Sequence, residues 1–172
     1  LAFMSIPSTV ITVPLFLMYS KIGLVGTPWA VIIPQLATPF GLYLMIIYAQ
    51  TSIPVSLIEA AKLDGASTWT IFWKVGFPLL SPGFVTVLLF TLVGVWNNYF
   101  LPLIMLSDTN DYPLTVGLNM WLKMGAQGTA NGQVPNNLII TGSLIAVVPL
   151  IIAFMFLQKY WQSGLAAGSV KQ

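Results

Sequence analysis

The chain has 172 residues, of which 57% are apolar and 6% are charged. A soluble domain carries about 25% charged residues, so this composition excludes an ordinary soluble fold and indicates a membrane protein. The absence of cysteine and histidine removes thiol catalysis, thiolate metal sites and the commonest proton shuttle, so we expect no enzyme, and no metal or other cofactor bound by this chain. The net charge of +2 rests on six scattered lysines, a pattern that does not predict nucleic-acid binding.

Four segments of the chain carry no charged side chain. They cover residues 1–20, 22–58, 75–107 and 124–158. About 20 apolar residues cross a hydrocarbon core of about 30 Å, so each segment has room for one span. The sequence therefore predicts an all-α, polytopic membrane helix bundle. Its four transmembrane helices are expected at about residues 1–20, 30–49, 83–106 and 138–157.

Prolines interrupt the first two predicted spans. Pro7 and Pro14 lie in the first, and Pro34 and Pro39 lie in the second. Proline removes a backbone donor and kinks a helix unless neighbouring groups compensate for the loss. Both spans are therefore expected to be interrupted helices.

Lysine counts predict the orientation of the chain. The polar segment 51–82 and the tail 158–172 are separated by two predicted spans, so they lie on the same side of the membrane. Together they hold four lysines, against two in the opposite loops. The positive-inside rule places the side with more lysines in the cytoplasm, and the C-terminus is accordingly expected there.

The polar segment 51–82 has the local chemistry of two short helices joined by a turn. Ser52 is a plausible N-cap for the first helix, and Gly65 supplies the left-handed conformation that follows a helix end. Ser67 or Thr68 is expected to cap the second helix, which Pro78 and the next proline, at position 82, are expected to end.

The two short helices carry more apolar side chains than water would tolerate. These residues are Leu57, Ile58, Ala61, Leu63, Trp69, Ile71, Phe72 and Trp73. They must face the membrane interface, the transmembrane bundle or a partner protein. An interfacial helix pair lying against its own bilayer is the alternative to a docking site, and local physics leaves both interpretations open.

The polar segment resembles the EAA loop of membrane subunits in bacterial ABC importers. The matching residues are Glu59-Ala60-Ala61, Asp64-Gly65-Ala66, Phe72, Pro78 and Pro82. The wider chain is similar to the carbohydrate-importer permeases of the maltose-uptake type, over essentially all 172 residues. That likeness includes Ile6-Pro7, Pro14-Leu15, Gly23-Leu24, Pro39-Phe40, Trp96-Asn97, Gly117-Leu118 and Gly164-Leu165-Ala166-Ala167-Gly168. Residues 123–137 match no pattern of that family.

The resemblance implies a six-helix permease fold, in which the EAA loop lies between the fourth and fifth spans. Here the loop follows only two predicted spans, and the chain begins without a methionine, inside an apolar run. We therefore expect an N-terminally truncated chain that is the C-terminal part of the transmembrane domain, with two spans missing.

The resemblance also implies a function, the ATP-driven import of a sugar or oligosaccharide. In the family the EAA loop is a coupling helix in a groove of a separate ATPase subunit, so Glu59, Ala60, Ala61, Asp64 and Gly65 are expected to dock there. The implied partners are a second permease subunit, an ATPase subunit dimer that holds ATP and magnesium, an extracytoplasmic solute-binding protein, the sugar and the lipid bilayer. The implied location is a bacterial inner membrane.

Polar residues within a predicted span mark a candidate solute pathway. Trp96, Asn97, Asn98 and Tyr99 place two amides beside aromatic rings, a combination suited to sugar hydroxyls, and amides inside a membrane need partners in protein or in a water-filled path. Hydrogen bonding between helices that merely holds the bundle together remains the alternative role.

Three other functions compete with sugar import. A self-contained channel or secondary transporter usually carries charged residues inside its spans, and none lies in the predicted spans. A permease for glycerol phosphate or a related solute would favour an anion-binding lysine or arginine in a span. A membrane assembly factor would leave the helix-turn-helix of the polar segment without a purpose.

Overall fold

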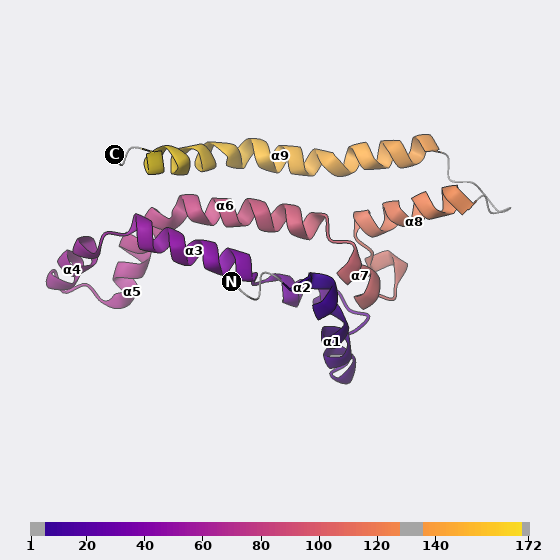
Figure 1. Ribbon diagram of the computed structural model, residues 1–172, viewed down its shortest axis with the longest axis horizontal. Helices are drawn as coiled ribbons and strands as arrows, with labels where there is room; N and C mark the ends of the chain where they lie inside the picture. Colours follow the sequence, from indigo (N-terminus) through magenta and orange to yellow (C-terminus); the bar gives the residue numbers. More distant parts are fainter. Residues whose placement is uncertain (1–5, 128–135, 170–172) are drawn as a thin grey trace. The chain divides into compact units, whose positions relative to one another are not determined.

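The computed structural model describes residues 6–127 and 136–169 of the chain. The regular elements in these ranges are all helical, which confirms the all-α fold. The α-helices are α1 (Ser8–Lys21), α2 (Trp29–Gln35), α3 (Pro39–Ser52), α4 (Val55–Leu63), α5 (Thr68–Ile71), α6 (Phe77–Trp96), α7 (Phe100–Met105), α8 (Leu114–Gln127) and α9 (Asn136–Ser169) (Figure 1). A π-helical turn, η2 (Phe72–Gly76), joins α5 to α6, and a 3-10 turn, η3 (Thr109–Asp111), precedes α8.

Three helical stretches among the described residues are long and apolar enough to cross a membrane: Trp29–Ser52, Thr68–Trp96 and Asn137–Lys159. Of the first predicted span, residues 1–5 lie outside the described residues. The helix that follows them, α1, has 14 residues, fewer than the roughly 20 that cross a bilayer.

The stretch Trp29–Ser52 is interrupted, as its prolines predict. Helix α2 ends at Gln35 and α3 begins at Pro39, where proline at the first helical position loses no hydrogen bond. Thr38 caps α3, because its hydroxyl accepts a hydrogen bond from the backbone N–H of Gly41 at 3.0 Å.

The expectation that Pro78 and Pro82 end a helix is wrong, because Thr68–Trp96 continues through both prolines. Just before Pro78 the bonding changes to the π pattern, in which the N–H of Phe77 donates to the carbonyl of Phe72. Pro78 therefore lacks its N–H at a point where the helix already changes its hydrogen-bond pattern. Pro82 lies in the interior of α6, where a membrane helix tolerates proline.

The expected N-cap role of Ser52 is also wrong. Ser52 is the last residue of α3, and the residue that precedes α4 is Pro54, with no side-chain cap. A residue before proline is pushed out of the helical region, and Ile53 is extended, with φ −110° and ψ 104°. The break therefore falls at Ile53-Pro54, immediately after the serine.

The described residues divide into two compact units, and the first consists of those that fall within Leu1–Ala37 and Val93–Ala153. Its core is formed by Tyr19, Ala30, Leu101 and Met105, with Ala30 and Met105 fully buried. The turn between α1 and α2 is tied to α7, because the N–H of Gly26 donates to the carbonyl of Met105 at 2.8 Å.

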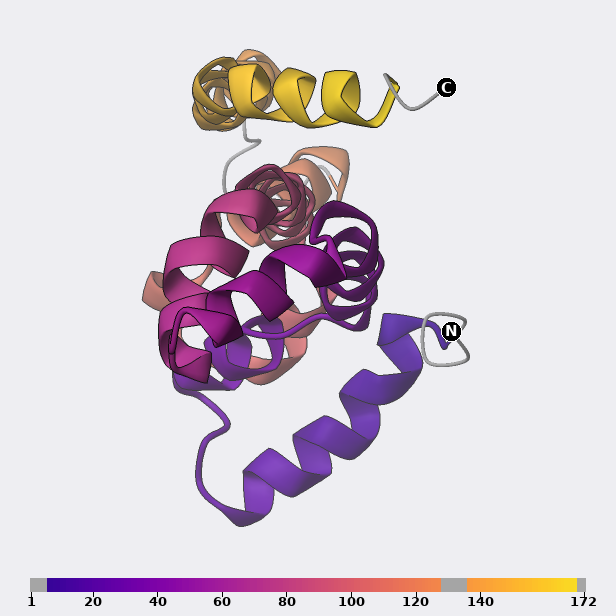
Figure 2. The ribbon, with the colours of Figure 1, turned by 90° about the vertical axis from the view of Figure 1, so that its left-hand side faces the viewer.

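The second unit consists of the described residues within Thr38–Leu92 and Phe154–Gln172. Helices α3 and α6 lie side by side in it (Figure 1), and Figure 2 views this unit from the end that carries α4 and α5. Phe40 of α3 meets Phe90 of α6 edge to face, with ring centroids 5.5 Å apart. Gly83 of α6 is buried against the ring of Tyr48 of α3.

We expect Gly83→Ala to destabilise the packing of α3 on α6. A Cβ at this position would lie 2.7 Å from Cδ1 of the Tyr48 ring, and overpacking of this kind costs about 1–3 kcal/mol. The free energy of unfolding of the detergent-purified protein should fall by that amount.

Gly94→Ala is the matched control in the same helix. A Cβ at Gly94 would meet nothing within 4 Å, so alanine should stabilise the protein by about 0.4–1 kcal/mol through the unfolded state. Equal effects of the two substitutions would contradict the close contact at Gly83.

Candidate functional site

The first predicted short helix and the turn after it are confirmed, and a second helix begins where it was predicted, although it continues into α6. Helix α4 ends at Leu63, and Gly65 takes the left-handed conformation with φ +77°. Its N–H donates to the carbonyl of Lys62 at 3.0 Å, which closes the helix end. Of the two predicted caps for α5, Ser67 is the one used, because its hydroxyl accepts from the N–H of Thr70 at 3.2 Å.

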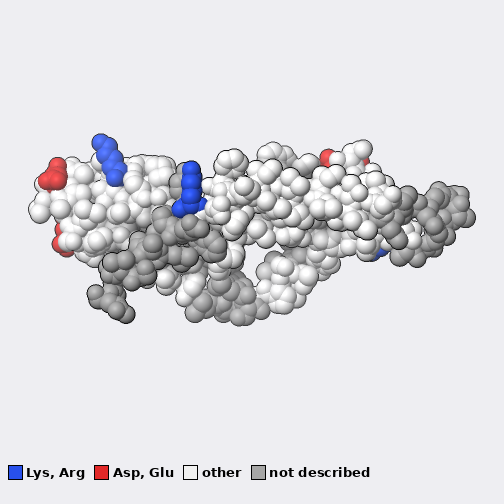
Figure 3. All heavy atoms as spheres, turned by 90° about the horizontal axis from the view of Figure 1, so that it is seen from above, with Lys and Arg blue, Asp and Glu red and all other residues white. Residues whose placement is uncertain are grey.

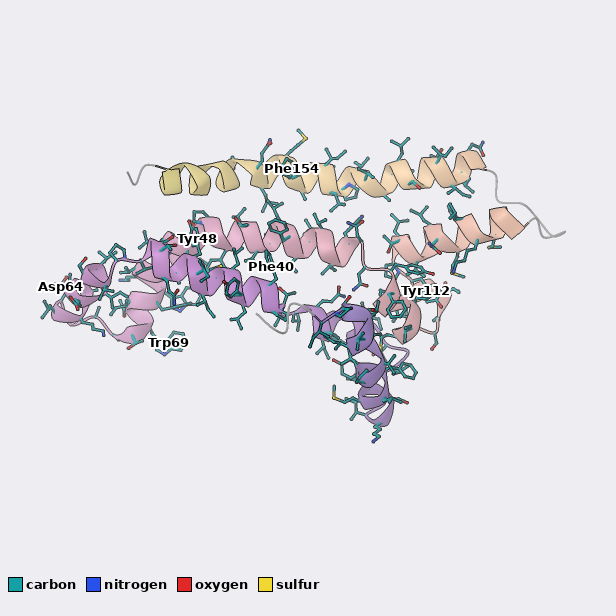
Figure 4. All side chains as sticks on the ribbon, viewed as in Figure 1. Phe40, Tyr48, Asp64, Trp69, Tyr112 and Phe154 are labelled. Carbon is teal, nitrogen blue, oxygen red and sulfur yellow. The ribbon has the colours of Figure 1, made fainter. Side chains whose placement is uncertain are left out.

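The residues expected to dock on an ATPase lie at this turn and on the helix before it. Glu59, Ala60, Asp64 and Gly65 are exposed, and Ala61 is half-buried. Figure 3 shows acidic side chains at the tip that carries α4, and Figure 4 places Asp64 at the turn. No ion pair joins Glu59 or Asp64 to another described residue, so both carboxylates are available to a basic partner.

Large apolar side chains of the helix pair are also exposed. The exposed fraction is 89% for Leu63, 73% for Trp69 and 56% for Trp73, and Trp69 projects outward from α5 (Figure 4). Neither α4 nor α5 contains a buried residue. Exposed apolar side chains of this kind indicate a surface that contacts a partner protein or a membrane.

Aromatic rings run without interruption from α5 into α6. Trp69 and Phe72 have ring centroids 6.3 Å apart, followed by pairs at 5.1, 5.2 and 5.1 Å through Trp73 and Phe77 to Phe84. Contacts of this kind are each worth about 0.5–1.5 kcal/mol beyond area burial. They stiffen the join between the short helix and the long one.

The four pathway candidates lie at the C-terminal end of the same helical stretch, but not within one helix. Helix α6 ends at Trp96 and α7 begins at Phe100, so Asn97, Asn98 and Tyr99 form a break rather than the interior of a span at 83–106. The indole N–H of Trp96 donates to the carbonyl of Ala146 on α9 at 3.1 Å.

The two amides of this break differ in their surroundings. Asn97 is exposed, and its amide nitrogen donates to the carbonyl of Val93, in its own helix, at 2.9 Å. Asn98 is half-buried, and its amide nitrogen donates to Oε1 of Gln35 on α2 at 3.1 Å. The hydroxyl of Tyr99 accepts a hydrogen bond from Nζ of Lys123 at 3.4 Å.

A pocket of about 300 Å³ lies beside this break, within the first unit. Its lining residues are Val31, Gln35, Val95, Trp96, Pro102, Pro113, Leu114 and Thr115. Trp96 is the one pathway candidate among them. The lining is mainly apolar, and its amide and hydroxyl come from Gln35 and Thr115.

Gln35 and Thr115 are not among the residues that the sequence predicts for this site. Gln35 carries the one amide of the predicted span 30–49, a signal of the same kind as the paired asparagines. Thr115 lies in a connection rich in polar residues, where a single hydroxyl gives no signal.

Comparisons with known proteins place the chain in a family. Residues 1–166 match the family model described as "Binding-protein-dependent transport system inner membrane component". A solved bacterial ABC transporter involved in the import of the acidic polysaccharide alginate contains a similar chain, with a TM-score of 0.70 and 30% identity. That match covers 87% of this chain and 55% of the other.

Curated relatives agree with this match. The arabinooligosaccharides transport system permease protein AraQ of Halalkalibacterium halodurans is 33% identical, over 99% of this chain and 58% of its own length. The melibiose/raffinose/stachyose import permease protein MelC of Bacillus subtilis is 33% identical, over 99% of this chain and 60% of its own. The glucose import system permease protein GlcU of Saccharolobus solfataricus is 37% identical, over 94% and 54% respectively.

The chain spans less than two thirds of the length of these relatives. The family model nevertheless covers nearly all of the chain, and the solved relative shares the fold over most of it. The chain therefore belongs to the inner membrane components of binding-protein-dependent transport systems.

Proposed function

We propose that the chain is part of a permease subunit of an ATP-driven importer, and that the importer translocates a sugar or oligosaccharide delivered by an external binding protein. The observation that carries this proposal is the helix pair α4–α5, which presents free carboxylates and large exposed apolar side chains at the base of a membrane-length helix. The names of AraQ, MelC and GlcU support a carbohydrate as the solute.

In this proposal the helix pair docks in a groove of an ATPase subunit. Ala60 and Ala61 permit close approach, Glu59 and Asp64 offer carboxylates to basic groups, and Gly65 sets the angle between the two helices. In this proposal ATP and magnesium belong to the ATPase pair, where ATP hydrolysis takes place. A second permease subunit completes the pore.

The stretch Thr68–Trp96 would connect docking to transport. Its 29 residues rise by roughly 43 Å at 1.5 Å per residue, which exceeds a hydrocarbon core of about 30 Å. The α5 end then lies in the cytoplasm, as the lysine counts favour, and the Trp96 end lies toward the outside. Closure of the ATPases would move this helix as a lever and shift the pore to its outward-facing state.

The break after Trp96 is the proposed wall of the solute pathway, with Trp96, Asn97, Asn98 and Tyr99 as its candidate residues. Amides orient sugar hydroxyls, and aromatic rings cover the apolar faces of a sugar ring. The exposed amide of Asn97 is the group most available for such a contact.

We expect Asn97→Leu to weaken uptake of the preferred sugar while the complex still assembles. One lost hydrogen bond of about 1 kcal/mol corresponds to about a fivefold rise in KM, and the order of preference among sugars should change. Uptake of labelled sugars by the full-length protein in its assembled complex measures this change. A variant that only fails to assemble would support a purely structural role for Asn97.

The function itself is tested with the full-length protein. Purification in mild detergent should retain an ATPase subunit and a second permease, and proteoliposomes should take up at least one of a panel of labelled sugars only when ATP and a solute-binding protein are supplied. Absence of any ATPase from the purified complex would contradict the importer. Uptake without ATP would favour a channel or secondary transporter.

A further inference from the structure

The main chain breaks at Asn98 for a reason that lies four residues further on. In a continuous helix the carbonyl of Asn98 would accept a hydrogen bond from the N–H of residue 102, but that residue is Pro102, which has no N–H. The carbonyl instead accepts from the hydroxyl of Thr115, on α8, at 3.3 Å. A side chain 17 residues away thus replaces the missing helical donor.

The side chain of Asn98 makes two further hydrogen bonds. Its amide oxygen accepts from the N–H of Leu101 at 3.3 Å, in the manner of a cap for α7. Its amide nitrogen donates to Oε1 of Gln35 at 3.1 Å, and the amide nitrogen of Gln35 in turn donates to the carbonyl of Val31 at 2.8 Å. Asn98 therefore joins three helices, namely α2, α7 and α8.

Asn97, the residue before Asn98, has no side-chain hydrogen bond to another helix among the described residues. It is exposed, its amide nitrogen turns back on its own helix, and its amide oxygen accepts no hydrogen bond from a described residue. A solute hydroxyl could bind this oxygen without displacing any contact between helices. The corresponding oxygen of Asn98 is already engaged.

From this contrast we infer that the two asparagines have different roles in the solute pathway proposed above. Asn98 is a positioning residue that holds the C-terminal end of α2 and the N-terminal ends of α7 and α8 around the end of α6, and Asn97 contacts the solute. We call the hydrogen bonds of Asn98 with Gln35, Leu101 and Thr115 the joint. These bonds persist during transport, so the four helix ends move as one body. This inference rests on the proposed function for its transport readout.

A double-mutant cycle tests the joint in the full-length assembled complex. Asn98→Ala and Gln35→Ala both remove the hydrogen bond between the two side chains, and each also removes one further bond of its own, so the thermal midpoint of the double variant should fall by less than the sum of the two single losses. Asn97→Ala combined with Gln35→Ala is the matched control, and there the two effects should add. Additive losses in the Asn98 cycle would overturn the joint.

Uptake kinetics separate positioning from contact. Asn98→Ala should lower the maximal uptake rate by about fivefold for every sugar tested, because fewer molecules hold the competent arrangement, with KM ratios between sugars unchanged. Asn97→Ala should change those ratios and leave the thermal midpoint unaltered. A change in KM ratios on Asn98→Ala would mean that Asn98 touches the solute, and would overturn the difference in roles.

Two variants keep the test informative if Asn98→Ala fails to assemble. Thr115→Val removes one of the three bonds of the joint and should give the same uniform loss of rate in milder form. The exchanged pair Gln35→Asn with Asn98→Gln keeps the summed side-chain length and should transport faster than either single exchange. No recovery in that pair would overturn the joint. If the wild-type complex shows no ATP-dependent uptake, the proposed function is refuted. The thermal midpoints of the double-mutant cycle would still show whether Asn98 and Gln35 are coupled.

Discussion

Gly65→Pro is expected to abolish retention of the ATPase by the full-length protein. Proline holds φ near −65°, whereas Gly65 has φ +77°, and proline would also remove the N–H that donates to Lys62. A conflict of this kind costs about 3 kcal/mol or more, which leaves the native turn roughly 100-fold less populated. The proposed docking residues on α4 and at the turn would then no longer keep one geometry relative to α5.

Two further substitutions control this result. Gly65→Asn should retain the ATPase, since asparagine tolerates the left-handed region better than other side chains. Gly23 also has a positive φ, of +71°, in the turn after α1, so Gly23→Pro does the same damage away from the docking surface and should leave the ATPase bound. ATPase content of the purified complex is the measurement, and equal loss in both proline variants would indicate general misfolding.

Met105→Ala is expected to destabilise the first unit by about 2–5 kcal/mol, the usual cost of a cavity left by a large buried side chain. Met105 is fully buried among Tyr19, Ala30 and Leu101, so little relaxation is available to fill the space. Denaturant or thermal unfolding of the purified protein measures the loss.

The control for Met105→Ala is the same change at an exposed methionine. Met18 of α1 is 52% exposed, and Met18→Ala should alter the free energy of unfolding by less than about 0.5 kcal/mol. Met105→Leu, which nearly conserves volume, should recover most of the stability. A small loss for Met105→Ala would contradict a tightly packed core at this site.

Local chemistry predicted α4, the turn after it and the start of α5 correctly, because everything that forms them is near in sequence. Gly65 needs a left-handed conformation, and Ser67 finds its hydrogen-bond donor three residues on. The docking residues belong to one short motif and therefore share one turn. Nothing distant is required to place them.

Prediction failed where distant or cooperative contacts decide the structure. Pro78 indicated a helix end, but the π-helical turn before it absorbs the missing donor. The helix predicted to continue to residue 106 ends at Trp96, beside Asn98, whose hydrogen-bond partners Gln35 and Thr115 lie 63 and 17 residues away. No hydropathy pattern contains those contacts.

The π-helical turn at Phe72–Gly76 has a consequence for rotation about the long helix. Because its hydrogen bonds run from residue i to i−5 rather than i−4, it adds one residue to the turn, and one residue of an α-helix corresponds to about 100°. A helical wheel drawn across Thr68–Trp96 would therefore assign wrong azimuths beyond the turn, by more than a quarter of a circle. The angular phase between Trp69 and Phe90, both in the second unit, is set by this extra residue, so deleting it would rotate Trp69 against Phe90 about the helix axis without changing either side chain.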